Sequence, residues 1–301
     1  TYAPRDAVQK AAETPPALRA ALQDAAEKIR IEATHNDRAY PLLAELCDDI
    51  GARLSGSPEL TKALGWAETR MREAGHEHVK IEPAMVPTWV RGAESLRMVT
   101  PQARALPVLG LGGSVSTPKG GLTAELAVVS TETELAARSD VRGKIVLIDR
   151  PLPPFDAEHN DSGYGTAYGS RVHGPSLAAK AGAVAVLVRS LTAHSLDTLH
   201  TGTLVYDEAA PRIPAGSVTA ETATHLHRLV DRGSKVSLTL SLASEDRGLT
   251  PSGNVVGELR GRERPVEVVV ISGHIDSWDV GQGAADDGAG IVIAMEALKI
   301  G

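Results

Sequence analysis

The sequence of 301 residues has a single cysteine, Cys47, and this scarcity excludes an intramolecular disulfide. One thiol leaves the redox compartment undetermined. Cys47 is expected on a helix, as a residue of the protein core. No block of lysines and arginines occurs, and acidic residues exceed basic ones by 38 to 31. Nucleic acid is therefore not an expected partner. No run of about 18 apolar residues is present, so the sequence predicts no membrane-spanning helix and no membrane partner.

A start methionine and a readable signal peptide are also missing, because the sequence begins at Thr1. We therefore expect a processed or trimmed protein. The composition, with 42% apolar and 23% charged residues, is that of a globular protein with enough chain for two domains.

The most informative stretch covers residues 266–290. It starts with a nearly all-apolar, β-branched run at 266–271, which predicts a strand buried on both faces of a parallel sheet. Polar residues follow directly after Gly273, and small residues predict a helix over 289–298. Polar side chains at the carboxyl end of a buried strand occupy the usual ligand site of an open α/β sheet.

The residue types in this stretch suit a metal ion, because imidazole and carboxylates are zinc ligands. Asp276 comes two residues after His274, so its carboxylate can accept the ring N–H and leave the other ring nitrogen for metal. Asp286 follows a glycine-rich turn that can fold back toward His274. Charges packed this densely beside a buried strand need a partner, and a divalent cation is the simplest one. A solvated acidic loop is the alternative interpretation.

Residues 274–290, with the sequence HIDSWDVGQGAADDGAG, resemble the metal-binding segment of the M28 family of di-zinc exopeptidases, most closely its carboxypeptidase Q branch. The resemblance implies that His274 binds one zinc ion, that Asp286 bridges two, and that Asp276 supports His274. It also implies a general-base glutamate after Asp287, where only Glu296 is present, inside the predicted helix. We therefore expect the base beyond residue 301, and the chain to be the N-terminal portion of a longer enzyme that is inactive without the rest.

The first hundred residues predict a polar arm over 1–16, three helices and two strands. The third helix has the clearest signals, with Ser57 as N-cap, Pro58 in the first turn and Gly75 just past its end. The segment 53–57 before it resembles the loop that opens the M28 domain, and a plain helix entry is the alternative interpretation. The predicted helices are 17–33, 38–50 and 58–74, and the predicted strands are 78–86 and 89–99.

From about residue 101 the sequence is rich in glycine, proline and short β-type runs. The segments 141–150 (VRGKIVLIDR) and 178–183 (AAKAGA) resemble a protease-associated (PA) domain, which several M28 members carry as an insertion. Residues 161–174 are interpreted as a long loop, either a lid or a surface loop. The predicted strands are 126–129, 144–149, 183–188 and 213–218, and the predicted helices are 175–181 and 221–232.

Together these patterns predict an α/β fold, a mixed sheet of zinc-exopeptidase type flanked by helices, with an inserted β-rich PA domain. The expected domains are residues 1–102 and 236–301 for the two peptidase segments, and 103–235 for the PA-like insertion. Strands at 254–259 and 266–272 are expected in one sheet with strands from 78–99.

The expected function is that of a zinc-dependent exopeptidase. The resemblance implies two zinc ions and dipeptides or short peptides cleaved from a free terminus, as aminopeptidase, carboxypeptidase or dipeptidase. Two alternatives stay open, namely a non-catalytic PA-domain binding protein and another two-metal hydrolase such as an amidase or phosphoesterase. The expected location is secreted or periplasmic, the expected partner is a small peptide, and a homodimer is left open.

Overall fold

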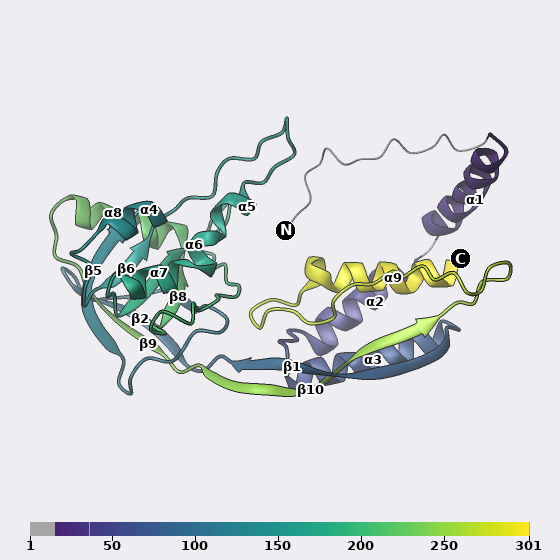
Figure 1. The fold of residues 1–301 in the computed structure, drawn as a ribbon, viewed down its shortest axis with the longest axis horizontal. Helices are drawn as coiled ribbons and strands as arrows, with labels where there is room; N and C mark the ends of the chain where they lie inside the picture. Colours follow the sequence, from purple (N-terminus) through teal and green to yellow (C-terminus); the bar gives the residue numbers. More distant parts are fainter. Residues whose placement is uncertain (1–15, 36, 301) are drawn as a thin grey trace. The chain divides into compact units, whose positions relative to one another are not determined.

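The computed structural model describes residues 16–35 and 37–300, and its ribbon is drawn in Figure 1. The described residues up to Ala84 and from Ser252 onward form one compact unit, which we call the helical unit. Met85–Pro251 form a second compact unit, which we call the sheet unit. Both boundaries between the units fall inside long strands, β1 (Glu77–Val90) and β10 (Glu245–Glu258), which pair in a two-stranded sheet.

The sheet unit is built on eight strands in the order β3-β2-β9-β5-β6-β7-β8-β4. The four neighbours β5 to β8 are parallel, and the pairs β2–β3, β2–β9, β5–β9 and β4–β8 are antiparallel. The strands are β2 (Glu94–Thr100), β3 (Arg104–Leu106), β4 (Leu109–Gly110), β5 (Leu122–Val129), β6 (Ile145–Ile148), β7 (Ala185–Arg189), β8 (Ala215–Val218) and β9 (Ser237–Leu242).

Strand β6 shows how the sequence produces a sheet that is covered on both faces. Its four residues are fully buried, and successive side chains of a strand point to opposite faces. Ile145 and Leu147 join one hydrophobic cluster, while Val146 and Ile148 join a second one. Burying each of these side chains contributes roughly 1.5–3 kcal/mol to folding. An uninterrupted apolar run is therefore required here, and an alternating one would be typical of a half-exposed strand.

Helices cover the two faces of this sheet (Figure 1). Helix α8 (Ala220–Asp231) packs Ala223 and Leu226 into the cluster that contains Ile145. Helices α4 (Glu132–Ala137) and α7 (Gly174–Lys180) pack into the cluster on the opposite face. The strands and helices predicted for residues 126–232 are thus confirmed.

The compact sheet unit is wider than the predicted insertion of residues 103–235. It also contains β2 and β9, because β2 pairs with β9 and β9 pairs with β5. The predicted division into two peptidase segments and a PA-like insertion stays a prediction. Residues 161–174, interpreted as a loop, include two short helices, α5 (Tyr164–Ala167) and α6 (Gly169–Val172).

The helical unit begins, within the described residues, at α1 (Pro16–His35), so the predicted arm at 1–16 lies almost wholly outside them. Its other elements are α2 (Ala39–Ala44), the π-helix η2 (Glu45–Ile50), α3 (Pro58–Glu73), the π-helix η3 (Ala284–Gly288) and α9 (Ala289–Ile300). No helix in residues 16–35 and 37–300 combines the length and apolar character needed to cross a membrane.

The start and the end of α3 follow the predicted signals. The Ser57 hydroxyl accepts a hydrogen bond from the Leu60 amide at 3.1 Å, which satisfies a free N–H at the helix start. Pro58 occupies the first turn, where no amide donor is needed. Gly75 follows the helix with a φ of +89°, a left-handed conformation that favours glycine.

Helix α9 packs against α2, η2 and α3 through a shared apolar core. Ile291 and Val292 of α9 pack with Leu42, Leu46 and Ala63. Met295, one turn further, packs with Met71 and Val79 in a neighbouring cluster. The predicted helix at 289–298 is therefore confirmed, and its first turn positions the polar loop that precedes it. Cys47 lies in this unit and is buried, as predicted.

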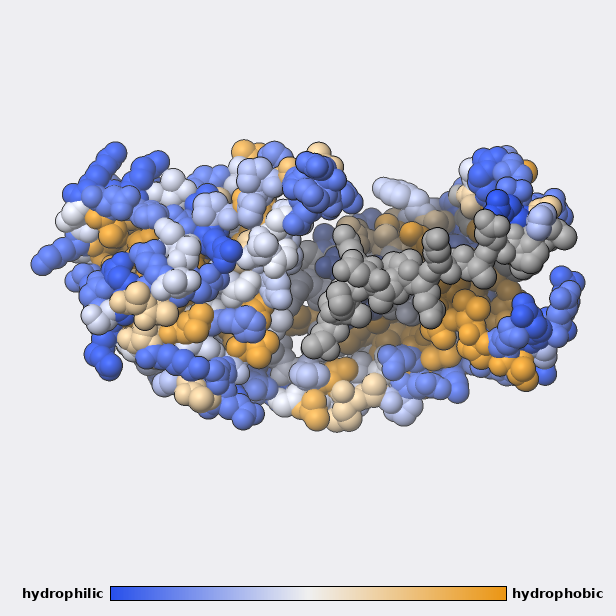
Figure 2. All heavy atoms as spheres, turned by 45° about the horizontal axis from the view of Figure 1, so that its top comes forward, coloured by the Kyte–Doolittle hydropathy of each residue, from blue (hydrophilic) through white to orange (hydrophobic). Residues whose placement is uncertain are grey.

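The predicted buried strand at 266–271 is wrong for this structure. The segment forms no strand, and Val266, Val268, Val269 and Val270 are 79–90% exposed. A strand buried on both faces needs neighbouring strands to satisfy its backbone and further layers, such as helices, that cover both faces of the sheet. Among the described residues of the helical unit, the strands are β1 and β10, and these pair with each other. Apolar residues lie at the surface of the molecule (Figure 2), and these four valines are among the exposed large hydrophobic residues.

Candidate metal centre

The three residues predicted for metal chemistry lie together in the loop before α9. The Nδ1 atom of His274 lies 3.0 Å from the Asp276 carbonyl oxygen and 3.2 Å from the Asp276 carboxylate. The Nε2 atom of His274 lies 2.9 Å from Oδ1 of Asp286. Asp276 thus faces one ring nitrogen and Asp286 faces the other, as the spacing of the three residues allows.

Asp287 has a different position from its neighbour Asp286, to which it is joined by a cis peptide bond. Its Oδ1 atom accepts a hydrogen bond from the Gly290 amide at 3.1 Å, in the manner of a helix N-cap for α9. Its Oδ2 atom accepts a bond from the His274 amide at 3.2 Å. Asp287 therefore ties the backbone of His274 to the start of α9, a role that sequence analysis missed. The signal was an aspartate three residues before a helical glycine.

Two glycines make room for the Asp287 side chain. A Cβ atom at Gly290 would lie 2.1 Å from Oδ1 of Asp287, and one at Gly273 would lie 2.6 Å from Oδ2. Real Cβ atoms do not approach other atoms so closely. The glycines in this loop thus serve close packing as well as backbone freedom.

Replacing Asp287 by alanine should lower the free energy of unfolding of the helical unit by about 1 kcal/mol, the usual effect of losing an N-cap. The additional bond to the His274 amide is lost as well. Denaturant unfolding followed by circular dichroism measures this change. Asp286→Ala is the matched control, because the Asp286 side chain is 87% exposed and contacts the His274 ring. Equal stability of the two variants would contradict the capping role.

The environment of His274 favours positive charge. Burial acts to lower the pKa of His274, but the hydrogen bonds that its ring donates to the Asp286 carboxylate and to the Asp276 carbonyl, with the charges of both carboxylates, outweigh it. The pKa of His274 is therefore raised above its ordinary value. Carboxylates that stabilise an imidazolium in this way also stabilise a bound cation at the same point.

The donor chemistry fits part of a zinc site. Two ligand atoms at ordinary zinc distances are separated by about 3.3 Å at a tetrahedral angle, so His274 and Asp286 need little movement to share an ion. A catalytic zinc usually takes three protein ligands. Within residues 16–35 and 37–300, no group of three or more His, Cys, Asp or Glu residues is arranged to hold a metal ion. The described residues therefore offer an incomplete set of ligands.

Two buried side chains next to this loop were not assigned by sequence analysis. Arg53 is 0% exposed and Ser277 is 7% exposed. The segment 53–57 was interpreted either as the M28 opening loop or as a plain helix entry. In the structure Ser57 does cap α3, and Arg53 is hydrogen-bonded to the loop at Ile275, Ser277 and Gln282. The sequence carried no sign that this arginine is buried.

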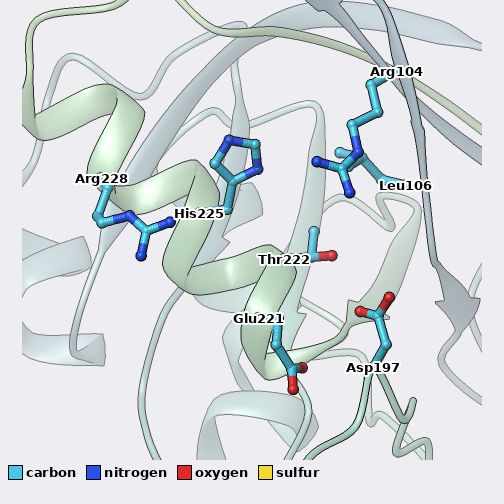
Figure 3. Close-up of a pocket in the computed structure, with 7 residues that line it drawn as sticks. All are labelled: Arg104, Leu106, Asp197, Glu221, Thr222, His225 and Arg228. Carbon is cyan, nitrogen blue, oxygen red and sulfur yellow. The ribbon is translucent and has the colours of Figure 1, made fainter.

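A surface cavity of about 520 Å³ lies in the sheet unit and contains none of the predicted metal residues (Figure 3). Burial and the neighbouring arginines lower the pKa of His225. Asp197 accepts a hydrogen bond from Thr219 and Glu221 accepts one from Ser195, so both acids of the cavity have partners. The lining residues are Arg104, Leu106, Asp197, Glu221, Thr222, His225 and Arg228.

Comparison with known proteins shows which families the chain is similar to. Residues 254–300 match the model of peptidase family M28, and residues 115–226 match the model of the PA domain. Over 273 residues, 90% of the chain, the sequence is 40% identical to carboxypeptidase Q of Mus musculus. The chain is an M28 peptidase homologue. The predicted M28 resemblance, PA domain and α/β fold class are thereby confirmed.

Solved structures agree with this M28 assignment. The M28 peptidase precursor of Shewanella amazonensis SB2B is 34% identical, with a TM-score of 0.87 over 92% of this chain. A zinc aminopeptidase of Bacillus subtilis is 21% identical with a TM-score of 0.60 over 87% of this chain and 56% of its own, and it shares the fold. The chain spans 56% of the mouse relative and 63% of the Shewanella chain.

Proposed function

We propose that the chain forms part of a zinc-dependent exopeptidase that hydrolyses dipeptides or short peptides from a free terminus. The proposal concerns what we call the extended protein, in which these 301 residues continue into residues that supply the remaining ligands. It is supported by 40% identity to carboxypeptidase Q and by the M28 match over the loop. Zinc is further supported by the fold shared with a zinc aminopeptidase.

The observation that carries the proposal is the arrangement around His274. One ring nitrogen faces Asp276, and the other lies 2.9 Å from the Asp286 carboxylate. A ligating histidine is typically held in this way, with its second nitrogen donating to a carboxylate or carbonyl, which fixes the tautomer. His274 and Asp286 are therefore the proposed ligands, and Asp276 is the proposed orienting residue.

The chain's own residues have distinct parts in the proposed reaction. Zinc, when bound, would supply a water molecule of lowered pKa and polarisation of the scissile carbonyl. His274 would hold zinc through Nε2 and Asp286 through its carboxylate, while Asp276 would keep the proton on Nδ1. Asp287 holds the backbone of His274 in place. A glutamate beyond residue 301 is the proposed general base, which takes the proton from water and delivers it to the leaving amine.

A short peptide is the proposed partner, and the proposed location is secreted or periplasmic. Both rest on the resemblance to M28 exopeptidases.

The decisive experiment assays the extended protein against a panel of dipeptides before and after treatment with a zinc chelator. Hydrolysis should fall to background with the chelator and should return when zinc is added. Metal analysis of the same samples should show zinc lost and regained in parallel. Dipeptides with an acetylated amino end or an amidated carboxyl end then show which free terminus is required.

Three results would point elsewhere. Hydrolysis that survives complete removal of metal would exclude the metal-dependent mechanism. Cleavage of amides or phosphoesters, with all peptides left intact, would favour another two-metal hydrolase. An extended protein that binds no zinc and hydrolyses none of these substrates, even when zinc is added, would favour a binding protein built on the PA domain.

A further inference from the structure

Arg53 is fully buried, and its guanidinium bonds to backbone carbonyls in two segments of the loop before α9. Its Nε donates to the Ile275 carbonyl at 2.7 Å. Its Nη1 donates to the Gln282 carbonyl at 2.6 Å and to the Gly51 carbonyl at 2.7 Å. Its Nη2 lies 3.4 Å from the Gly283 carbonyl. A single rigid side chain thus connects two segments that are distant in the loop.

The backbone of Arg53 adds a second connection to the same loop. Its amide donates to the Ser277 hydroxyl at 3.0 Å, and its carbonyl accepts from the Ser277 amide at 3.0 Å. Ser277 is itself buried. The segment from His274 to Ser277 is therefore held both by main-chain bonds and by the guanidinium.

The two connected segments carry the proposed ligands. Ile275 lies between His274 and Asp276, and we call residues 274–277 the histidine arm. Gln282 and Gly283 precede the helical turn that carries Asp286, and we call residues 282–286 the aspartate arm. A guanidinium has a planar, fixed set of donors, so it sets the separation of the carbonyls that it joins. The separation of the arms in turn sets the distance from His274 to Asp286.

The aspartate arm approaches Arg53 as closely as a glycine allows. A Cβ atom at Gly283 would lie 2.3 Å from Cβ of Ser277 and 3.0 Å from Nη2 of Arg53. Gly283 also has a φ of +60°, which favours glycine. The contact between the arms and Arg53 is therefore built into the backbone of this loop.

The buried charge also has an electrostatic consequence. Burial lowers the pKa of Arg53, and the charge of Asp276 acts in the opposite direction. Placing a cation in the interior is unfavourable unless dipoles or anions stabilise it, and here carbonyl oxygens surround it.

We infer that Arg53 is a positioning residue of the metal centre, because it holds the histidine arm and the aspartate arm at the separation that lets His274 and Asp286 share a zinc ion. This inference rests on the proposed function for the identity of the metal. The geometric part, that Arg53 orders the two arms, can be tested without any metal.

The first test uses the 301-residue chain and needs no metal. Hydrogen exchange is measured for the amides of Ser277 and Gly288, which bond to the carbonyls of Arg53 and Gly283. In Arg53→Met these amides should exchange about 10- to 100-fold faster, since hydrogen bonds to a charged group are lost. Amides inside α3 should exchange as in the wild type. Unchanged exchange at both loop amides would overturn the inference.

The second test measures zinc affinity of the extended protein by competition with a chelator. Arg53→Met should weaken zinc binding about 10- to 100-fold, as expected for loss of a group that orients ligands. Arg53→Lys should restore part of the affinity, because it keeps the charge but loses the planar set of donors. The absorption spectrum of the cobalt-substituted protein should change in the methionine variant.

Arg72→Met is the matched control for both tests. Arg72 belongs to α3 in the same unit, is exposed, and bonds to Glu68 and to the Val79 carbonyl, each at 2.7 Å. It should leave loop exchange, zinc affinity and the cobalt spectrum unchanged. Equal zinc affinity of the wild type and Arg53→Met would overturn the positioning role. Failure of the wild type to bind zinc would contradict the proposed function, and the exchange test would still decide whether Arg53 orders the arms.

Discussion

Replacing His274 by alanine is expected to remove most of the bound zinc from the extended protein and to reduce its peptidase activity to near background. The Nε2 atom of His274 and the Oδ1 atom of Asp286 are the two proposed metal-ligand atoms, and they lie 2.9 Å apart. Loss of the imidazole therefore leaves a single carboxylate. Zinc affinity should fall by more than about 100-fold, the upper range for loss of a residue that merely supports a ligand. Metal analysis after dialysis and the dipeptide assay give the two measurements.

Two further variants show whether this loss is specific to a ligand. Asp276→Asn should weaken zinc about 10- to 100-fold, because an amide holds the imidazole less well than a carboxylate does. His78→Ala is the control, since His78 is an exposed histidine of the same unit whose partner is Glu258 at 2.9 Å. Unchanged zinc content in His274→Ala, with zinc present in the wild type, would show that the ligand is assigned wrongly.

The 301-residue chain by itself is expected to hydrolyse no dipeptide above background, even with added zinc. The described residues offer no group of three metal ligands. Glu296 is buried inside α9, with 4% of its surface exposed, and is therefore not placed to act as a general base on a substrate. Losing a general base alone reduces rates by about 10²–10⁴-fold. A dipeptide panel with and without chelator measures the activity, and metal analysis should find little zinc retained after dialysis.

The extended protein, prepared and assayed in parallel, is the positive control for this experiment. Circular dichroism and the exchange protection of α3 amides would show that the helical unit of the shorter chain is folded under the assay conditions. Chelator-sensitive turnover by the folded 301-residue chain would mean that the catalytic residues lie within it and have been misplaced.

The helices and the strands of the sheet unit could be predicted because local signals and burial agree there. Strand β6 is apolar at every position and is buried on both faces, and α3 has a serine at its start and a glycine after its end. Such elements depend on hydrophobic pattern and capping, which a sequence displays directly. The extent of the sheet was less visible, because no local signal shows that β9 pairs with both β2 and β5.

Residues 266–271 show the limit of hydrophobic pattern. The run of valines is typical of a central strand, yet in this structure it is exposed and irregular. A strand is stabilised by hydrogen bonds to its neighbours, and in the described residues of the helical unit β1 and β10 pair with each other in a two-stranded sheet that does not include this segment. The pattern reports what the segment can bury, and the partners determine whether it does.

For the candidate centre, the sequence by itself determined which residue types are available for metal binding, namely one imidazole and nearby carboxylates. His274, Asp276 and Asp286 were predicted from residue type, spacing and resemblance, and the structure places both aspartates within hydrogen-bonding distance of His274. Only the tertiary structure decided what holds them there. Asp287 and Arg53 act through backbone groups of residues up to 230 positions away in the chain, and a hydrogen bond to a carbonyl or amide leaves no mark on the identity of its partner. Side chains that contact backbone therefore become visible only when the chain is folded.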